Sequence, residues 1–328
     1  MAGPDDLLAR PIPADGVGPG SQPEEADGAD LQYLSMPGAM HTYRQPMLPE
    51  PADAAACAAG LGALRTLQLH LIHYRVGALP QVIDLNELPP LDRQLVTDSL
   101  GEGEVSIRRR AADASRPGLD AAADTEAQET RLAGVWRVRG AGDAADGRRR
   151  DVLEVAAVPG FVSAHAFAAA ADDVSLPEPL PAGVMNAPGV LAELLEQVQL
   201  RAGLDEPTGG LEASDSPPGF DGPAPQLPAH VVNLTLLPQS EQDLACLGDS
   251  LGRGPVSMLS RGYGNCRVTA TALREVWWVQ YFNSDDKLIL NTLEVTPVPA
   301  AVLAAQEDID DSAERLREIL TALTESAA

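Results

Sequence analysis

The chain has 328 residues, and 45% of them are hydrophobic, which excludes wholesale disorder and allows one large domain or two of ordinary size. Its net charge of −25 argues against binding to a phosphate backbone, so we expect no nucleic-acid partner. No run approaches the roughly 18 apolar residues of a membrane span, and the acidic N-terminus does not resemble a secretory signal. The sequence therefore predicts a cytoplasmic protein that does not insert into a membrane.

Composition divides the chain into five consecutive segments. We expect an acidic extension rich in Pro and Gly at residues 1–52, a first α+β repeat at 53–160, a connection rich in Ala and Pro at 161–189, a second α+β repeat at 190–299, and an acidic C-terminal helix within 300–328. A stretch rich in Gly, Pro and Asp at 202–228 predicts a flexible loop inside the second repeat. The C-terminal helix is predicted from an apolar seam that includes Ile309, Leu316 and Leu320.

The two repeats are predicted from an internal duplication. Four blocks recur in the same order: residues 82–89 (VIDLNELP) as 231–238 (VVNLTLLP), 98–103 (DSLGEG) as 249–254 (DSLGRG), 135–138 (VWRV) as 276–279 (VWWV), and 153–155 (LEV) as 293–295 (LEV). Four collinear blocks argue against chance similarity in a biased composition, so the two segments are interpreted as copies of one unit.

Each copy has the same order of predicted elements. A helix comes first, then a β-branched strand, a second helix (about 92–100 and 241–251), and three further strands. We therefore predict an α+β fold of two tandem duplicated units, each with a mixed or antiparallel sheet covered by helices, plus the C-terminal helix.

The copies differ between their second and third predicted strands, where the second copy has the short segment 260–271 (SRGYGNCRVTAT). Two glycines around Tyr263 free the backbone to approach a partner closely. Arg261 and Arg267 flank Cys266, whose thiol a neighbouring arginine can acidify. The alternative is a tight strand connection that buries a cysteine.

The third predicted strand differs as well. Alternation of side chains places Trp136 and Trp277 on corresponding faces, which we expect to be core in both copies. On the opposite face the first copy has Arg137 where the second has Trp278, and Phe282 follows on that face. This aromatic face must be covered, either by the C-terminal helix or by a docked protein.

No catalytic motif or cluster of metal ligands is recognised, so we expect no enzyme activity, no cofactor and no metal site. The arginine runs at 108–110 and 148–150 are interpreted as solvated loop ends. We predict a partner-binding surface that consists of Arg261, Gly262, Tyr263, Gly264, Asn265, Cys266, Arg267, Trp278, Phe282, Asp308, Asp310 and Asp311.

Several stretches form a specific set of motifs: 230–238 (HVVNLTLLP), 251–255 (LGRGP), 260–267 (SRGYGNCR), 277–283 (WWVQYFN), 290–295 (LNTLEV) and 305–316 (AQEDIDDSAERL). Together they resemble the HupH/HyaF (HoxQ-like) hydrogenase expression/formation proteins. The segment from 33–37 (YLSMP) to 47–50 (MLPE) resembles the N-terminal stretch of that family, so the resemblance covers most of the chain.

This resemblance implies an accessory protein in the maturation of [NiFe] hydrogenase. It implies a chaperone that binds the precursor of the iron–sulfur small subunit before export, beside a thioredoxin-like companion. A twin-arginine signal on such a client would be basic, and the acidic chain suits it. Two alternatives stay open: a thiol- or cofactor-handling enzyme that uses Cys266, and a passive assembly scaffold.

Overall fold

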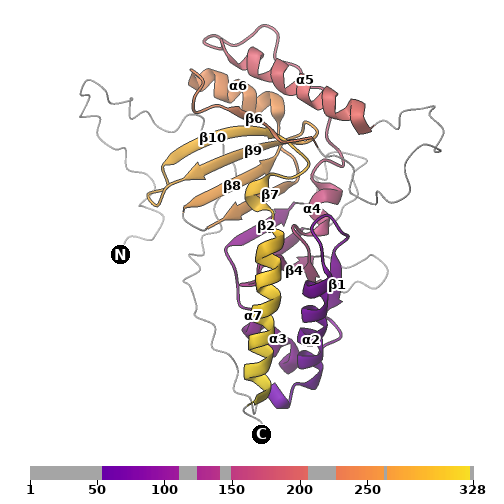
Figure 1. Ribbon diagram of the computed structural model, residues 1–328. Helices are drawn as coiled ribbons and strands as arrows, with labels where there is room; N and C mark the ends of the chain where they lie inside the picture. Colours follow the sequence, from indigo (N-terminus) through magenta and orange to yellow (C-terminus); the bar gives the residue numbers. More distant parts are fainter. Residues whose placement is uncertain (1–53, 111–123, 141–148, 206–226, 262–263, 326–328) are drawn as a thin grey trace, which may run out of the picture.

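Figure 1 shows the computed structural model of the chain, which describes residues 54–110, 124–140, 149–205, 227–261 and 264–325. Its helices are α2 (Ala58–His73), α3 (Pro90–Leu100), α4 (Gly160–His165), α5 (Ala187–Asp205), α6 (Glu241–Leu251), the 3₁₀ helix η2 (Ala300–Val302) and α7 (Gln306–Glu325). Its strands are β1 (Gln81–Asp84), β2 (Val105–Arg109), β3 (Thr125–Glu129), β4 (Val135–Gly140), β5 (Arg150–Val155), β6 (His230–Asn233), β7 (Val256–Ser260), β8 (Asn265–Ala270), β9 (Val276–Phe282) and β10 (Leu288–Val295). The extension predicted for residues 1–52 and most of the loop predicted at 202–228 lie outside the described residues.

The described strands form one continuous sheet in the order β1-β5-β4-β3-β2-β7-β8-β9-β10-β6. All neighbouring pairs are antiparallel. From its outer edge inward, the first half has the order β1-β5-β4-β3-β2 and the second half the order β6-β10-β9-β8-β7. The two halves therefore have the same strand order. The halves join where β2 pairs with β7, with Val105 opposite Ser260. The predicted α+β fold of two duplicated units is confirmed, and the two units share a single sheet.

Each half contains five strands among the described residues, one more than the four that the sequence predicts. The additional strands, β3 and β8, fall in the segments that we interpret as connections. Ala127 is the one buried residue of β3, and Cys266, Val268 and Ala270 are those of β8. With a single apolar inner residue, β3 lacks the apolar alternation that predicts a strand. In β8 polar and apolar residues do alternate, and the interpretation of this segment as a glycine-rich loop overlooked that pattern.

The first half buries its helices against the C-terminal helix. Leu64 and Leu71 of α2 are fully buried and share one core cluster with Leu316 and Leu320 of α7. Figure 1 shows α7 lying along the first half, beside α2 and α3. The helix predicted at the C-terminus is confirmed, but the idea that it covers Trp278 is wrong, because it packs on the other half.

A single buried carboxylate organises the helices of the second half. Helix α6 begins with a capping box, in which Ser240 Oγ accepts the Asp243 N–H and Asp243 Oδ2 accepts the Ser240 N–H, each at 3.0 Å. The other carboxylate oxygen, Oδ1, accepts the N–H groups of Met185, Asn186 and Ala187 at 2.8–2.9 Å. Asp243 is fully buried, so one side chain fixes the start of both α5 and α6.

The opposite face of the sheet carries a core that both halves share. Trp136 and Trp277 are fully buried and belong to one cluster. Their Nε1–H groups donate to the carbonyls of Ala156 at 2.9 Å and Thr296 at 3.1 Å. Val162 of α4 and Val302 of η2 pack into the same cluster. The expectation that the two tryptophans lie on a core face is confirmed.

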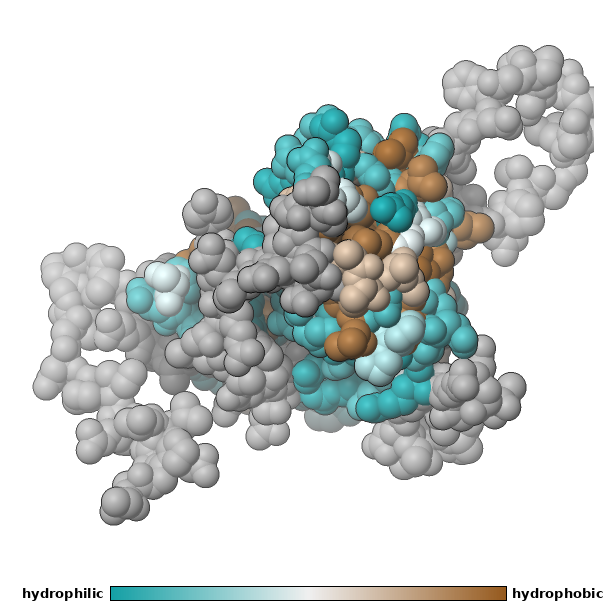
Figure 2. All heavy atoms as spheres, turned by 90° about the horizontal axis from the view of Figure 1, so that it is seen from below, coloured by the Kyte–Doolittle hydropathy of each residue, from teal (hydrophilic) through white to brown (hydrophobic). Residues whose placement is uncertain are grey.

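The surface of the molecule also carries some apolar residues. Figure 2, which views the molecule from below, shows brown apolar residues bordered by teal polar ones on that end. On the first half, Leu69 and Ile72 of α2 are 56% and 47% exposed. Exposed apolar side chains are common on folded proteins, so these mark no site by themselves.

Candidate functional site

The middle of the sheet presents an open polar surface on its helix side. Figure 1 shows the large helices gathered toward the two ends of the sheet, with the seam of β2 and β7 between them. We define the central polar face as the exposed or half-buried residues Ser106, Arg108, Glu126, Gln128, Ser257, Leu259, Arg267, Thr269, Gln280 and Phe282. The residues that alternate with them, such as Ile107, Met258 and Val268, are buried in the shared core. Alternation along the strands thus separates a core face from a face available to a partner.

Arg267 and Phe282 form an aromatic contact on this face. The guanidinium carbon of Arg267 lies 5.3 Å from the centre of the Phe282 ring, within the range of a cation–π contact. Burial lowers the pKa of Arg267, and the nearby Asp286 carboxylate opposes that shift. The pair combines a half-buried aromatic ring with a guanidinium group, which is a common composition for binding hot spots.

The β7–β8 hairpin holds the predicted loop. Gly264 has φ +125°, and a Cβ atom there would lie 2.5 Å from the Phe282 carbonyl oxygen, so this position requires glycine. Asn265 Nδ2 donates to Asp286 Oδ1 at 2.7 Å and ties the hairpin to the β9–β10 turn. Gly262 and Tyr263 lie outside the described residues. The segment from Asn265 onward is strand rather than loop, which corrects the sequence interpretation.

Cys266 points away from the arginines that were expected to activate it. Its side chain lies in the shared core, whereas Arg267 follows it on the opposite face of the sheet. Burial raises the pKa of the Cys266 thiol to about 11, although a hydrogen bond with Tyr281 acts in the other direction. The thiol is therefore protonated at neutral pH, and this environment does not favour the thiolate that the cysteine-based alternative requires.

Trp278 is a core residue. It is 5% exposed and packs in one cluster with Val198 of α5 and Leu247 of α6. Its Nε1–H donates to Asn291 Oδ1 at 2.5 Å. The prediction that Trp278 belongs to a docking surface is contradicted by this burial, because the two helices of the second half already cover the indole. Phe282, at the end of the same strand, remains half-buried.

The acidic residues predicted for the surface lie on the first turns of α7. Asp308, Asp310 and Asp311 are all exposed. Asp310 accepts a hydrogen bond from Gln306 Nε2 at 2.9 Å and lies 3.9 Å from the guanidinium of Arg75. Asp308 acts electrostatically on Glu129, at the end of β3. The start of α7 therefore places negative charge beside the first half of the central polar face, not at the Arg267 end.

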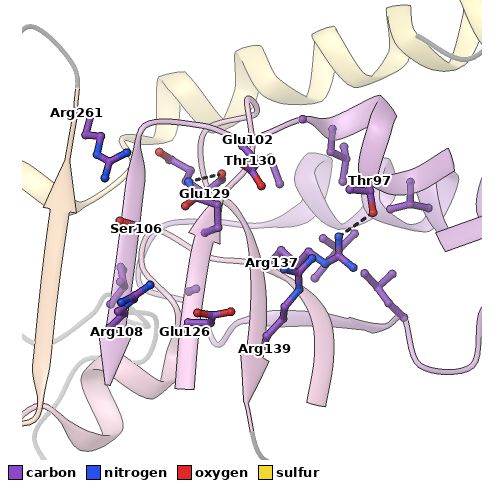
Figure 3. Close-up of a pocket in the computed structure, with 18 residues that line it drawn as sticks. Thr97, Glu102, Ser106, Arg108, Glu126, Glu129, Thr130, Arg137, Arg139 and Arg261 are labelled. Carbon is purple, nitrogen blue, oxygen red and sulfur yellow. Dashed lines mark hydrogen bonds between the residues drawn. The ribbon is translucent and has the colours of Figure 1, made fainter. Parts of the chain in front are cut away.

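A pocket opens where α3 meets the central polar face of the first half. Its volume is about 270 Å³. Figure 3 shows Arg108, Glu126 and Arg139 on neighbouring strands along one side, with Arg261 reaching in from β7. The register places Arg108 opposite Glu126, and Glu126 opposite Arg139. The interpretation of the 108–110 run as a solvated loop end is wrong for Arg108 and Arg109, which lie in β2.

Arg137 forms the inner wall of this pocket and is held in place on both sides. Its Nε and Nη2 donate to the two carboxylate oxygens of Asp151, both at 2.8 Å, and Nη1 donates to Thr97 Oγ1 at 2.8 Å. Burial works against ionisation, but Arg137 and Arg139 hold the pKa of Asp151 below its usual value. Arg137 is the counterpart of Trp278, so the two halves fill the same position with opposite chemistry.

Within the described residues, no group of three or more His, Cys, Asp or Glu side chains has a geometry that could hold a metal ion. None of the helices there is both long and apolar enough to cross a membrane.

The family model for the HupH hydrogenase expression protein, C-terminal conserved region, matches residues 58–175 and 184–323, which together make up most of the chain. The chain belongs to the HupH family. The two matched segments correspond to the two halves that share the sheet, and the second includes α7. The resemblance recognised in the sequence is confirmed.

Individual relatives of this HupH-family chain are similar over nearly their whole length. The hydrogenase expression/formation protein HupQ of Azotobacter chroococcum mcd 1 is 45% identical, over 94% of this chain and 96% of that protein. The hydrogenase-1 operon protein HyaF of Escherichia coli K12 is 32% identical, over 95% and 96%. A solved structure of the hydrogenase expression protein HupH from Thiobacillus denitrificans is 25% identical, with a TM-score of 0.32, over 40% of this chain and 92% of that one.

Glu129 gives this HupH-family protein a testable pH dependence. Burial raises the pKa of its carboxyl to about 7, the N–H of Gly134 opposes this, and the charges of Glu104 and Asp308 add to it. As the pH rises from about 4.5 to 7, the unfolded chain releases this proton before the folded protein does. Stability therefore falls through this window, by up to about 3 kcal/mol.

Glu129→Gln should remove most of that loss. We expect the variant to gain stability relative to the unsubstituted protein between pH 5 and pH 8, as measured by urea unfolding. Glu126→Gln, an exposed position on the same strand, is the matched control and should leave the pH dependence unchanged. Parallel pH profiles for the Glu129→Gln variant and the unsubstituted protein would contradict the assignment.

Proposed function

We propose that this protein takes part in hydrogenase maturation as a non-catalytic chaperone that binds the precursor of the iron–sulfur small subunit, in the cytoplasm and alongside a thioredoxin-like companion. The names of its relatives, hydrogenase expression/formation proteins, support the maturation role. The single observation that carries the binding role is the central polar face, an open sheet surface with the Arg267–Phe282 pair at one end.

The central polar face has physical properties that suit binding of a protein. A half-buried aromatic ring gains free energy when a partner covers it, and the stacked guanidinium can donate to carbonyl or carboxylate groups at the rim. Arg267 lies in β8, which pairs with β7 and β9, and Phe282 ends β9, which pairs with β8 and β10. The backbone that carries the pair is therefore fixed, so little conformational entropy is lost on binding. Rigid presentation of the pair supports affinity as well as specificity.

Charge supports the same proposal. The chain carries a net charge of −25, and Asp308, Asp310 and Asp311 are exposed on α7. A field of this sign accelerates encounter with a basic segment and repels acidic competitors. Steering of this kind weakens as salt is added, because the Debye length shortens to about 8 Å at physiological ionic strength.

Substitution of the aromatic pair tests the proposal. We expect Phe282→Ala and Arg267→Glu each to weaken capture of the tagged small-subunit precursor by roughly tenfold or more, the loss typical of a hot-spot residue. The measurement is a quantitative pull-down or titration with purified precursor, with melting curves to check that each variant folds. Arg65→Glu, an exposed charge reversal on α2, is the matched control.

The outcome that contradicts the proposal is specific. If folded Phe282→Ala and Arg267→Glu variants both capture the precursor as well as the Arg65→Glu control does, the central polar face is not the binding surface. If the unsubstituted protein captures no precursor at all, the chaperone role itself fails.

A further inference from the structure

We propose that the pocket between α3 and strands β2–β4 is a recognition site for a carboxylate group on an aliphatic stem, presented by an extended peptide. Its volume of about 270 Å³ is just below the range of roughly 300–1,000 Å³ for sites that enclose a small molecule. The pocket therefore suits one side chain or chain end with its adjacent backbone rather than a cofactor.

The inner wall of the pocket is apolar. Leu85, Val96, Leu100 and Leu153 all line it and are nearly or fully buried in the first-half core. Desolvation of an aliphatic stem against these side chains is favourable, at about 25 cal/mol per Å² of apolar surface removed from water. The aliphatic stem of a ligand can therefore pack against this apolar wall, with its carboxylate directed toward the strands.

The charged groups of the pocket favour an anion at that end. Among the residues that the structure describes, the side chains of Arg108 and Arg261 form no ion pair or hydrogen bond with the protein, and Figure 3 shows both at the pocket. Arg139 contacts Asp151 only loosely, at 3.7 Å. Arg137, in contrast, is fully engaged by Asp151 and serves as wall. Guanidinium groups bind carboxylates through paired, charge-assisted hydrogen bonds, which are about twice as strong as neutral ones.

The acidic residues of the pocket do not cancel these arginines. Glu126 lies between Arg108 and Arg139 in the strand register, so one carboxylate stands beside two guanidinium groups. The carboxyl of Glu129 lies at the far end, and its raised pKa of about 7 means that it is only partly ionised at neutral pH. Arg108 and Arg139 thus lie beside a single carboxylate, Glu126, while Arg261 lies at the other end of the β2–β7 pairing.

Comparison of the halves shows that the fold does not require these arginines. The duplicated sequence aligns Arg108 with Leu259, and Arg137 and Arg139 with Trp278 and Gln280. The second half keeps the same strand order without a guanidinium at any of these positions. Arg108, Arg137 and Arg139 are therefore specific to the first half, as expected for a binding site and not for a structural requirement of the unit.

Three short peptides test the proposal without any hydrogenase subunit. The first is acetyl-Ala-Leu-Glu-Leu-Ala-amide, the second has glutamine in place of glutamate, and the third is the glutamine peptide with a free C-terminal carboxylate. We expect the glutamate peptide or the free-carboxylate peptide to bind at least about tenfold more tightly than the neutral peptide, as measured by calorimetry. Whichever of these two peptides binds more tightly shows whether the pocket binds a side-chain carboxylate or a C-terminal carboxylate.

Substitutions assign the binding to the pocket. Arg108→Gln should lower the affinity for the preferred acidic peptide by about tenfold, whereas the exposed control Arg65→Gln should leave it unchanged. Equal affinity for acidic and neutral peptides, absence of binding up to about 1 mM, or an equal loss in the Arg65→Gln control would overturn the proposal. Because no client is used, failure of precursor capture leaves this test unaffected.

Discussion

Trp278→Ala is expected to destabilise the protein by about 3–5 kcal/mol, the usual cost of truncating a large buried aromatic residue. The indole is 5% exposed beneath α5 and α6, and its Nε1–H is paired with Asn291. Truncation leaves a cavity and also an unpaired buried amide oxygen, and the two costs add. Urea unfolding monitored by circular dichroism measures the loss.

Phe282→Ala on the same strand is the comparison, because that ring is only half-buried and its removal should cost clearly less. A loss below about 1 kcal/mol for Trp278→Ala, within the range of ordinary surface substitutions, would show that the indole is not part of the core. Together the two variants separate the structural residue of this strand from the residue available to a partner.

Asp243→Ala should cost more than about 3 kcal/mol, since it leaves several buried N–H donors without an acceptor. Burial alone would raise the pKa of Asp243, but the N–H groups of Ala187 and Ser240 and the Ser240 hydroxyl hold it well below its usual range. A depressed carboxyl pKa stabilises the folded state above the unfolded pKa of about 3.9, and this contribution disappears as the pH falls further. The difference in stability between the Asp243→Ala variant and the unsubstituted protein should therefore become smaller in acid.

The first half offers a matched substitution. Asp92 is the residue of α3 that aligns with Asp243, and its Oδ1 accepts the Gly60 N–H of α2 at 2.7 Å. Within the described residues, the Asp92 carboxylate accepts fewer hydrogen bonds than the Asp243 carboxylate, so Asp92→Ala should cost less stability than Asp243→Ala. Two results would contradict the role assigned to the Asp243 carboxylate. One is an equal loss of stability in the two variants at pH 7, and the other is a loss of stability in Asp243→Ala that does not change with pH.

Local patterns were sufficient to predict much of the fold. Apolar residues at helical spacing, such as Leu64 and Leu71, predict α2, and the repeated blocks predict two copies of one unit. The union of the copies through β2 and β7 was beyond prediction, because strand pairing between distant segments leaves no periodic signal. The position of α7 was missed for the same reason: its seam predicts burial but not the half that buries it.

The candidate site was predicted only in part. The Arg267–Phe282 pair follows from the unusual hairpin and from alternation along β9, both of which are visible in the sequence. Trp278 was misplaced because alternation identifies a face without telling which element covers it. The pocket was missed because Arg261 reaches the first half only through the pairing of β2 with β7. The sequence does contain one indication of the pocket, because Arg137 occupies the position at which the other copy has Trp278.

The packing of α7 on the first half has a consequence for synthesis of the chain. Ile309, Leu316 and Leu323, near the end of the sequence, complete a core whose other members begin at Ala54. Domains generally fold as units in the order in which a ribosome delivers them. Here the earlier half lacks part of its own interior until translation has passed residue 323, so its apolar helices stay incompletely covered while the later half emerges. The half that is synthesised first is therefore the one whose core is completed last, only after nearly the whole polypeptide has been made.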